Sequence, residues 1–362
     1  MKTLLLLLIT AVGAYAADYP TVIHIGYPGV GNDGFSPLGV SVPGGIAIKG
    51  LFEQEFKKEG IHIDWQFFKG AGPALNESLA NGLLDFAAGL GDLPAIVHYA
   101  GGFKSELLAT SSRRQNTYVL VPSSSSATTL QDLIGKRLGI QKGTNASLAW
   151  TKLVLDQGFK ESDFKTLNLD PATSREAIAT SDIDGYVGGS DVFQVRNRGA
   201  GRVVFTTAGR NPLLGRFSNL YVTQAFEQKY PQVVQRILDV WVREAAWESD
   251  ENNRAAVFRL YGKSGQPSGD FKEDFGKDTL ASHNSPLLDD HFYHHFTLAI
   301  QISLQAKFIR HTIDLNGWVN DKYLKQALKD DHLEGFWAEY DENGNLKTAD
   351  HSTTALSGSS SK

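Results

Sequence analysis

The sequence predicts an α/β protein of two lobes, each a mixed sheet flanked by helices, with two segments crossing between them. Strands rich in β-branched and aromatic residues alternate with helical patterns through most of the chain, as in α/β folds. The 362 residues suit two domains of ordinary size. We predict lobe I over residues 17–115 and 211–340 and lobe II over residues 116–210, with crossings near 111–116 and 209–215.

The composition is that of an ordinary globular protein. It is 41% hydrophobic and 21% charged, with a formal net charge of −5. This mild acidity argues against a nucleic-acid binder, which usually carries a basic face. The chain has no cysteine, so it has neither a disulfide framework nor a cysteine that could carry a lipid.

The first sixteen residues have the features of a cleaved secretory signal. Residues 1–16 contain one lysine, a short leucine-rich core and a small-residue end at Ala14 and Ala16. The apolar stretch 4–12 is too short to span a bilayer, which takes about 20 residues. We therefore expect a soluble periplasmic protein without a lipid anchor, ending in a polar tail over 341–362.

The first predicted strand, 21–27, precedes a glycine-rich stretch, 29–34, that matches G-x-G-x-x-G. A dinucleotide site would need a helix opening at these glycines and an acidic residue after the next strand. Two prolines interrupt instead, and Lys69 follows the second strand. We predict a long ligand-facing loop over 28–43 and then a helix over 44–58.

Residues 65–94 combine two strands with two glycine turns, each of which opens a helix. The strand 65–68 leads to a turn with a proline early in the helix, and the strand 84–88 leads to the second turn. The first amides of a helix lack intrahelical partners and favour anions at the positive end of the helix dipole. These turns supply six predicted ligand-binding residues: Gly72, Pro73, Ala74, Gly91, Asp92 and Leu93.

Two further strand-to-helix turns fall in the predicted second lobe. Its expected strands are 118–121, 137–140, 164–169, 183–189 and 203–207, with helices over 145–157 and 171–180. The first turn contains Gly143, Thr144 and Asn145, and the second contains Ser190 and Asp191. Such residues often only cap their own helix. The recurrence of the turn in matching places favours ligand binding.

The chain then returns to the first lobe. We predict a strand over 217–223 and helices from 231 and near 251–261, 287–310 and 321–327. Arg113, Arg114 and Arg216 flank the crossings and could face a bound anion. Arg113 is kept in the predicted site. Three aromatic residues could line an apolar pocket, although such residues are more often core: Tyr27, Phe35 and Trp150.

The sequence shows no catalytic constellation. One group could suggest a metal site: Asp289, Asp290, His291, His294 and His295. It lacks the glutamate of the H-E-x-x-H pattern, and no second cluster complements it. Neither a G-x-S-x-G elbow nor a P-loop is present. We therefore predict no metal, no cofactor and no enzymatic activity.

The glycine turns resemble those of the substrate-binding proteins of ABC importers for aliphatic sulfonates, taurine and nitrate. The similarity runs from about Thr21 to Leu328. Its most specific parts are 70–75 (GAGPAL), 81–86 (NGLLDF), 91–94 (GDLP) and 130–144 (LQDLIGKRLGIQKGT). The resemblance implies the type II periplasmic-binding-protein fold, which closes on its ligand between two lobes. It also implies that neutral donors at the helix starts hold the anionic head.

The implied function is that of a monomer that captures a small organic anion, foremost an aliphatic sulfonate, for the membrane permease of an ABC importer. Taurine, sulfate esters and nitrate are alternatives, as is a pyrimidine-precursor-related binder or enzyme on the same fold. The family commonly carries Trp-Asp-Pro at the fourth turn, where this chain has Gly189, Ser190 and Asp191, so one wall of the pocket is missing. Asn219 stands near a position that often carries asparagine, and it completes the predicted site.

Overall fold

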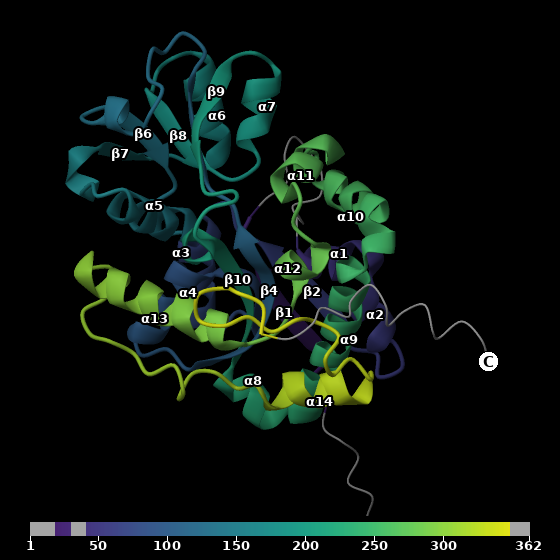
Figure 1. The fold of residues 1–362 in the computed structure, drawn as a ribbon. Helices are drawn as coiled ribbons and strands as arrows, with labels where there is room; N and C mark the ends of the chain where they lie inside the picture. The colour runs from purple at the N-terminus through teal and green to yellow at the C-terminus, as the bar shows by residue number, and fades with distance from the viewer. Residues whose placement is uncertain (1–18, 30–40, 348–362) are drawn as a thin grey trace, which may run out of the picture.

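The computed structural model describes residues 19–29 and 41–347. In these residues the chain forms two five-stranded sheets with helices around each, as the sequence predicts (Figure 1). The predicted signal peptide, most of the predicted loop 28–43 and the last part of the predicted tail lie outside the described residues. Within the described ranges, no helix combines the length and the apolar character that crossing a membrane requires.

Sheet I, with its helices, forms lobe I and has the strand order β2-β1-β3-β10-β4. Its strands are β1 (Val22–Tyr27), β2 (His62–Phe67), β3 (Phe86–Gly91), β4 (Ser105–Gln115) and β10 (Arg216–Thr223). β1 pairs in parallel with β2 and β3, whereas β10 runs antiparallel to β3 and β4. The carboxyl ends of β1 and β3 therefore lie at one edge of the sheet, together with the start of β10.

Helices cover both faces of sheet I. One core joins Ile23 and Ile25 to apolar residues of α1 (Val42–Lys49), α2 (Leu51–Glu55), α8 (Gln224–Lys229), α9 (Pro231–Ser249) and α14 (Lys322–Asp330). A second core joins Ala87 and Leu90 to α3 (Ala71–Ala80), α4 (Asp92–Ala100) and α13 (Asp290–Gln305). Successive residues of a strand point to opposite faces, and β3, β4 and β10 accordingly supply buried residues to both cores.

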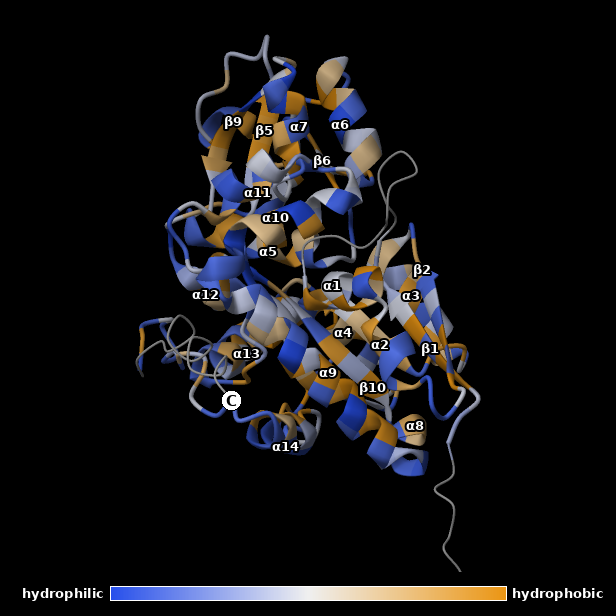
Figure 2. Ribbon diagram, turned by 90° about the vertical axis from the view of Figure 1, so that its right-hand side faces the viewer, coloured by the Kyte–Doolittle hydropathy of each residue, from blue (hydrophilic) through white to orange (hydrophobic). Residues whose placement is uncertain are grey.

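Sheet II, with its helices, forms lobe II and has the order β7-β6-β8-β5-β9. Its strands are β5 (Tyr118–Pro122), β6 (Arg137–Ile140), β7 (Lys165–Asn168), β8 (Gly185–Gly188) and β9 (Gly201–Thr206). β6 is parallel to β7 and β8, and β5 is antiparallel to β8 and β9. Its helices are α5 (Asn145–Asp156), α6 (Pro171–Ala179) and α7 (Val192–Asn197). Figure 2 shows hydrophobic residues on β5 and β9, in contrast to the mainly hydrophilic α14.

Several predicted boundaries were wrong. The helix predicted over 44–58 is interrupted at Gly50, which has a left-handed φ of 64°. β2 begins at His62, three residues before the prediction, and β4 continues to Gln115 because β10 pairs along its whole length. The residues predicted as the first crossing therefore belong mostly to a strand. The sequence also did not predict three short 3₁₀ helices: Glu161–Asp163, Pro212–Leu214 and Gly262–Ser264.

A helical segment after α9 reaches from lobe I toward lobe II. It contains α10 (Arg254–Tyr261), α11 (Ser268–Phe275) and α12 (Leu280–Asn284), and Figure 1 shows α11 between α7 and α10. Glu273 forms an ion pair with Arg196, and Asn197 Nδ2 donates to Asp270 Oδ1 at 3.0 Å. The sequence did not predict α11 or α12, because both are short and rich in polar residues. They form one wall of the space between the lobes.

Candidate functional site

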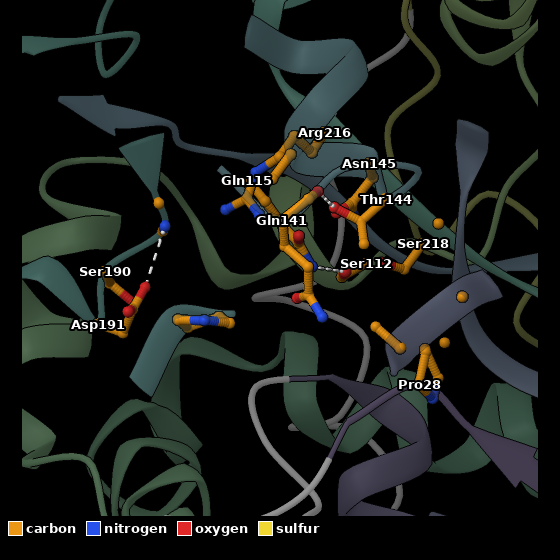
Figure 3. Close-up of a pocket in the computed structure, with 18 of the residues that line it drawn as sticks. Pro28, Ser112, Gln115, Gln141, Thr144, Asn145, Ser190, Asp191, Arg216 and Ser218 are labelled. Atoms are coloured by element: carbon orange, nitrogen blue, oxygen red, sulfur yellow. Dashed lines mark hydrogen bonds between the residues drawn. The ribbon is translucent and has the colours of Figure 1, made fainter. Parts of the chain in front are cut away.

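A cavity of about 310 Å³ lies between the two sheets, within the usual range for small-molecule sites. Residues of β3, β4 and β10 line it from lobe I, residues of α5 and β8 line it from lobe II, and residues between α10 and α12 close a further side. In Figure 3, Gln115, Gln141 and Arg216 lie between Thr144 with Asn145 and Ser190 with Asp191. Both lobes therefore contribute polar groups to one space.

The start of α5 presents free backbone donors to the cavity. Thr144 is the N-cap residue, but its hydroxyl donates to Gln141 O at 2.7 Å and accepts nothing from the helix. The amides of Ser147 and Leu148 bond to Thr144 O, which leaves those of Asn145 and Ala146 at the cavity wall without a partner among the described residues. The alternative that Thr144 merely caps its own helix is therefore not what the structure shows. Thr144 and Asn145 both line the cavity.

Two predicted glycines, Gly72 and Gly91, line the cavity from lobe I. A Cβ on Gly72 would be 2.4 Å from Pro94 Cγ, so only glycine permits this approach of α3 to α4. Ala71, beside Gly72, has a left-handed φ of 52°, a strained conformation at the cavity wall.

Three other residues of the predicted turns lie beside the cavity and outside its lining. Pro73 and Ala74 belong to the first turn of α3, and a Cβ on Gly143 would be 3.1 Å from Pro73 Cγ. Pro73 and Gly143 thus form a contact between the lobes. Pro73, Ala74 and Gly143 thus adjoin the lining residues Gly72 and Thr144 but do not belong to the lining.

The turn before α4 differs from the prediction. Asp92 Oδ1 accepts the amide of Leu93 at 2.8 Å, and its Oδ2 bonds His295 Nε2 at 3.0 Å. The side chain of Leu93 is fully buried in the second core of lobe I. Asp92 therefore accepts a backbone amide of its own helix, and that amide is not available to a ligand. We remove Asp92 and Leu93 from the candidate ligand contacts.

Ser190 and Asp191 both line the cavity after β8. Asp191 accepts hydrogen bonds from Arg175 at 3.0 Å, from the Tyr186 hydroxyl at 2.8 Å and from the amide of Gly189 at 3.1 Å. The charge of Asp191 is compensated by Arg175, so this carboxylate repels an anion less than its sequence position suggests. Burial and the adjacent Asp191 together raise the pKa of Tyr186, which stays a neutral donor.

Arg216, at the start of β10, is a cavity-lining cation that the predicted set of ligand-binding residues does not include. Its Nη2 donates to Asn116 O at 2.7 Å, and among the described residues no carboxylate lies within ion-pairing distance of it. A Cβ on Gly189 would be 2.8 Å from this Nη2. Arg216 is therefore available to an anion in the cavity.

Arg113 and Asn219 do not reach the cavity. Arg113 is fully buried and pairs with Asp289 at 2.5 Å. Burial would raise the pKa of Asp289, but Arg113 and two backbone amides hold it below its usual value. Asn219 is also fully buried and donates to the Tyr221 hydroxyl at 3.2 Å. Both side chains are bonded to other residues inside lobe I, so we remove them from the candidate ligand contacts.

The structure also bears on the predicted aromatic lining and on the possible metal site. Tyr27 lines the cavity, Trp150 lies in the core of lobe II, and Phe35 is outside the described residues. In the part of the chain that the structure describes, no three His, Cys, Asp or Glu side chains are grouped so that they could hold a metal ion. Burial and nearby Arg113 lower the pKa of His291 to about 3, so it is neutral at pH 7.

The sequence reasoning missed several polar residues of the lining: Ser112, Gln115, Gln141, Ser218, Gln266, Asp274, His283 and Asn284. The extension of β4 and its pairing with β10 bring Ser112, Gln115 and Ser218 to the cavity. For Ser112 and Gln115 the sequence signal was the polar run from 111 to 116. No local signal marked the residues from α11 and α12.

Comparison with known proteins gives a consistent result. Residues 55–250, more than half of the chain, match the protein family described as NMT1/THI5 like. A Bacillus subtilis (strain 168) protein named for aliphatic sulfonate binding is 25% identical over 289 residues, which are 79% of this chain and 84% of that protein. The solved structure of the periplasmic sulfonate-binding protein SsuA from Methylobacillus flagellatus KT matches with a TM-score of 0.77 and 26% identity, over 89% of this chain and 98% of SsuA.

The same fold also occurs in an enzyme. The desulfurization enzyme DSZB matches with a TM-score of 0.65 and 15% identity, over 86% of this chain and all of that chain. At this identity the likeness concerns the fold alone. The two-lobe fold with mixed sheets is thus confirmed, and the chemistry of the cavity has to be argued from its residues.

Proposed function

The chain belongs to the NMT1/THI5-like family, and on that premise we propose that it is the solute-binding component of an ABC importer and holds a small organic sulfonate between its lobes. The relatives named for sulfonate binding support this assignment. We also propose that it acts in the periplasm as a monomer and delivers its ligand to a membrane permease; the predicted signal peptide supports this location.

The observation that carries the proposal is the meeting of two kinds of anion donor in one cavity. The amides of Asn145 and Ala146 open α5, and the guanidinium of Arg216 faces the same space with no carboxylate partner in the described part of the chain. A helix start attracts negative charge, and a guanidinium forms two parallel hydrogen bonds with planar or tetrahedral oxyanions. A sulfonate offers three acceptor oxygens, which suits donors that converge from both lobes.

Several neutral donors complete the proposed site. Ser112 and Ser218 of lobe I and Thr144 of lobe II line the cavity with hydroxyl groups. Hydroxyl groups and oriented amides can hold a singly charged head group without several cations, because the donors are already in place and partly desolvated. Contacts from both lobes would make the closed arrangement more favourable with ligand than without it.

We further propose that the protein binds its ligand without turnover. The relatives matched over most of their length are named as binding proteins. Of the histidines near the cavity, His283 lines it, and its Nε2 bonds Asp278 at 3.1 Å while its ring stacks on Phe275. Among the described residues no hydrogen bond joins His283 to a serine of the lining, so the nucleophile–base pair that a serine hydrolase needs is not formed.

Isothermal titration calorimetry tests the proposal. The mature chain from Ala17 is titrated at fixed salt with alkanesulfonates of increasing length, with sulfate, with nitrate and with a dicarboxylate. We expect binding of sulfonates and no loss of ligand after incubation. Arg216→Gln should weaken that binding by about tenfold or more, since a hydrogen bond to a charged group contributes about 1.5–3 kcal/mol.

A matched control is Arg198→Gln, which removes an exposed arginine of lobe II whose one bond to the described residues is to Gln194 O. This variant should bind sulfonates like the unmodified chain. Absence of sulfonate binding, or equal affinities of the Arg216 and Arg198 variants, would contradict the proposed site.

A further inference from the structure

The cavity contains one carboxylate whose charge is not compensated. The described residues contribute two acids to its lining: Asp191 pairs with Arg175, whereas no described lysine or arginine lies within ion-pairing distance of Asp274. An isolated carboxylate beside an anion site costs affinity for a purely anionic ligand. A positive charge on the ligand would offset this cost.

Asp274 is held in place by neutral donors. Its Oδ1 accepts from Asn116 Nδ2 at 3.0 Å and from the Tyr118 hydroxyl at 2.7 Å, and no bond to its Oδ2 is formed by the described residues. The preceding residue, Glu273, pairs with Arg196 of lobe II, which fixes α11 across the cleft. The carboxylate is thus positioned and keeps its second oxygen for another partner.

Arg216 and Asp274 both line the cavity, and both are bonded to Asn116. Arg216 Nη2 donates to the backbone oxygen of Asn116, and the side-chain amide of Asn116 donates to Asp274. The lining therefore presents a positive group and a negative group at neighbouring places. A ligand with the opposite arrangement of charges would match both.

We propose that Asp274 is a specificity-determining residue and that the ligand is an organosulfonate whose tail carries a protonated amine. This inference rests on the proposed function, with the sulfonate at Arg216 and the start of α5 and the ammonium at Asp274. The cavity of about 310 Å³ leaves room for a tail beyond the sulfonate head.

A pair of nearly isosteric ligands tests the inference. Calorimetry at pH 7 compares 3-aminopropane-1-sulfonate with butane-1-sulfonate, which has a methyl group in place of the ammonium. The unmodified chain should bind the amine about tenfold or more tightly, as expected for a desolvated charged hydrogen bond. Asp274→Asn keeps an oxygen that can accept from Asn116 and Tyr118 but removes the charge. This substitution should abolish the preference, because it weakens the binding of 3-aminopropane-1-sulfonate and leaves that of butane-1-sulfonate unchanged.

The matched control is Glu273→Gln, which removes the neighbouring charge of α11 outside the cavity lining. It should change both affinities by the same factor. Equal affinities for the two ligands in the unmodified chain would overturn the inference and leave the proposed function intact. An equal loss for both ligands in Asp274→Asn would also overturn it, because that result marks a purely structural role. Binding of neither ligand, nor of any other sulfonate, would overturn the proposed function itself.

Discussion

Gly91 at the end of β3 lies against Asn145 at the start of α5, so closely that a Cβ on Gly91 would be 2.7 Å from Cβ of Asn145. The two residues belong to different lobes, and both line the cavity. Gly91 has a φ of −71°, which any residue adopts. The requirement for glycine therefore comes from the approach of the lobes and not from the backbone conformation.

Gly91→Ala should consequently disturb ligand binding more than folding. The added methyl group must push the start of α5 away, and such overpacking costs about 1–3 kcal/mol. We expect sulfonate affinity, measured by calorimetry, to fall by about tenfold or more. In the control Gly269→Ala, the new Cβ of α11 meets no atom within 4 Å, and affinity should be unchanged. Unchanged affinity in Gly91→Ala would show that this contact is not needed for binding.

The difference between Gly91 and Arg216 shows what the sequence can predict about this cavity. Glycine turns after strands are local patterns, and Gly72, Gly91, Thr144 and Asn145 indeed line the cavity. An arginine on a crossing segment carries no local sign of its direction. The pairing of β10 with β4 and β3 brings Arg216 to the cavity and turns Asn219 into the core.

The fold was predictable in outline because strand and helix periodicities are also local. The lengths of β2 and β4 were not, since pairing partners far along the chain extend them. The wall formed by α11 was missed because its position depends on the ion pair of Glu273 with Arg196 and on the bond of Asn116 to Asp274. Such contacts leave no periodic pattern in either segment.

Arg113→Met should strongly destabilise the chain. It leaves Asp289 buried without its cation, and loss of one partner of a buried pair costs about 3–5 kcal/mol. Urea unfolding at pH 7 should show this loss, whereas Arg243→Met, which removes an exposed cation, should change stability by about 0–1 kcal/mol.

The cost of Arg113→Met should also depend on pH. The folded-state pKa of Asp289 is lowered, so its contribution is present above the usual range of a carboxyl and is lost as the pH falls. Because a protonated Asp289 needs no cation, the difference between the two chains should shrink below about pH 4. A difference that stays constant down to acidic pH would contradict this account.

Glu248→Gln should stabilise the chain at alkaline pH. Burial, with the adjacent Glu244 carboxylate, raises the pKa of Glu248 well above its usual value, and its Oε2 accepts from the Tyr261 hydroxyl at 2.8 Å. The folded state therefore keeps a proton that the unfolded state releases, and stability is lost as the pH rises above the usual carboxyl range. We expect the variant to gain a few degrees in Tm at pH 8, where 1 kcal/mol corresponds to roughly 2–4 °C, and almost nothing at pH 4. The exposed Glu53→Gln is the control, and equal effects of the two substitutions at pH 8 would refute the prediction.

Lys152 offers the clearest pH test, because it is a buried cation between the lobes. Its Nζ donates to Gly215 O at 3.3 Å and lies 3.4 Å from His295 Nδ1, and His295 in turn bonds Asp92. Burial lowers the pKa of Lys152 to about 8, although Asp92 acts in the opposite direction. Burial and Lys152 lower the pKa of His295 to about 4, so this ring is neutral at pH 7 and can accept from the ammonium.

Between about pH 8 and pH 10.5 the unfolded chain keeps the lysine proton while the folded chain has lost it, so stability rises with pH through this window. Lys152→Met removes the effect. We measure the free energy of unfolding of both chains with urea. From pH 7 to pH 10 it should rise by about 2–3 kcal/mol more in the unmodified chain than in the variant. Comparison of the two chains cancels the other groups that titrate in this range, and the exposed Lys142→Met should show no such shift. A constant difference across the window would mean that Lys152 keeps an ordinary pKa, and hence that water reaches its ammonium between the lobes.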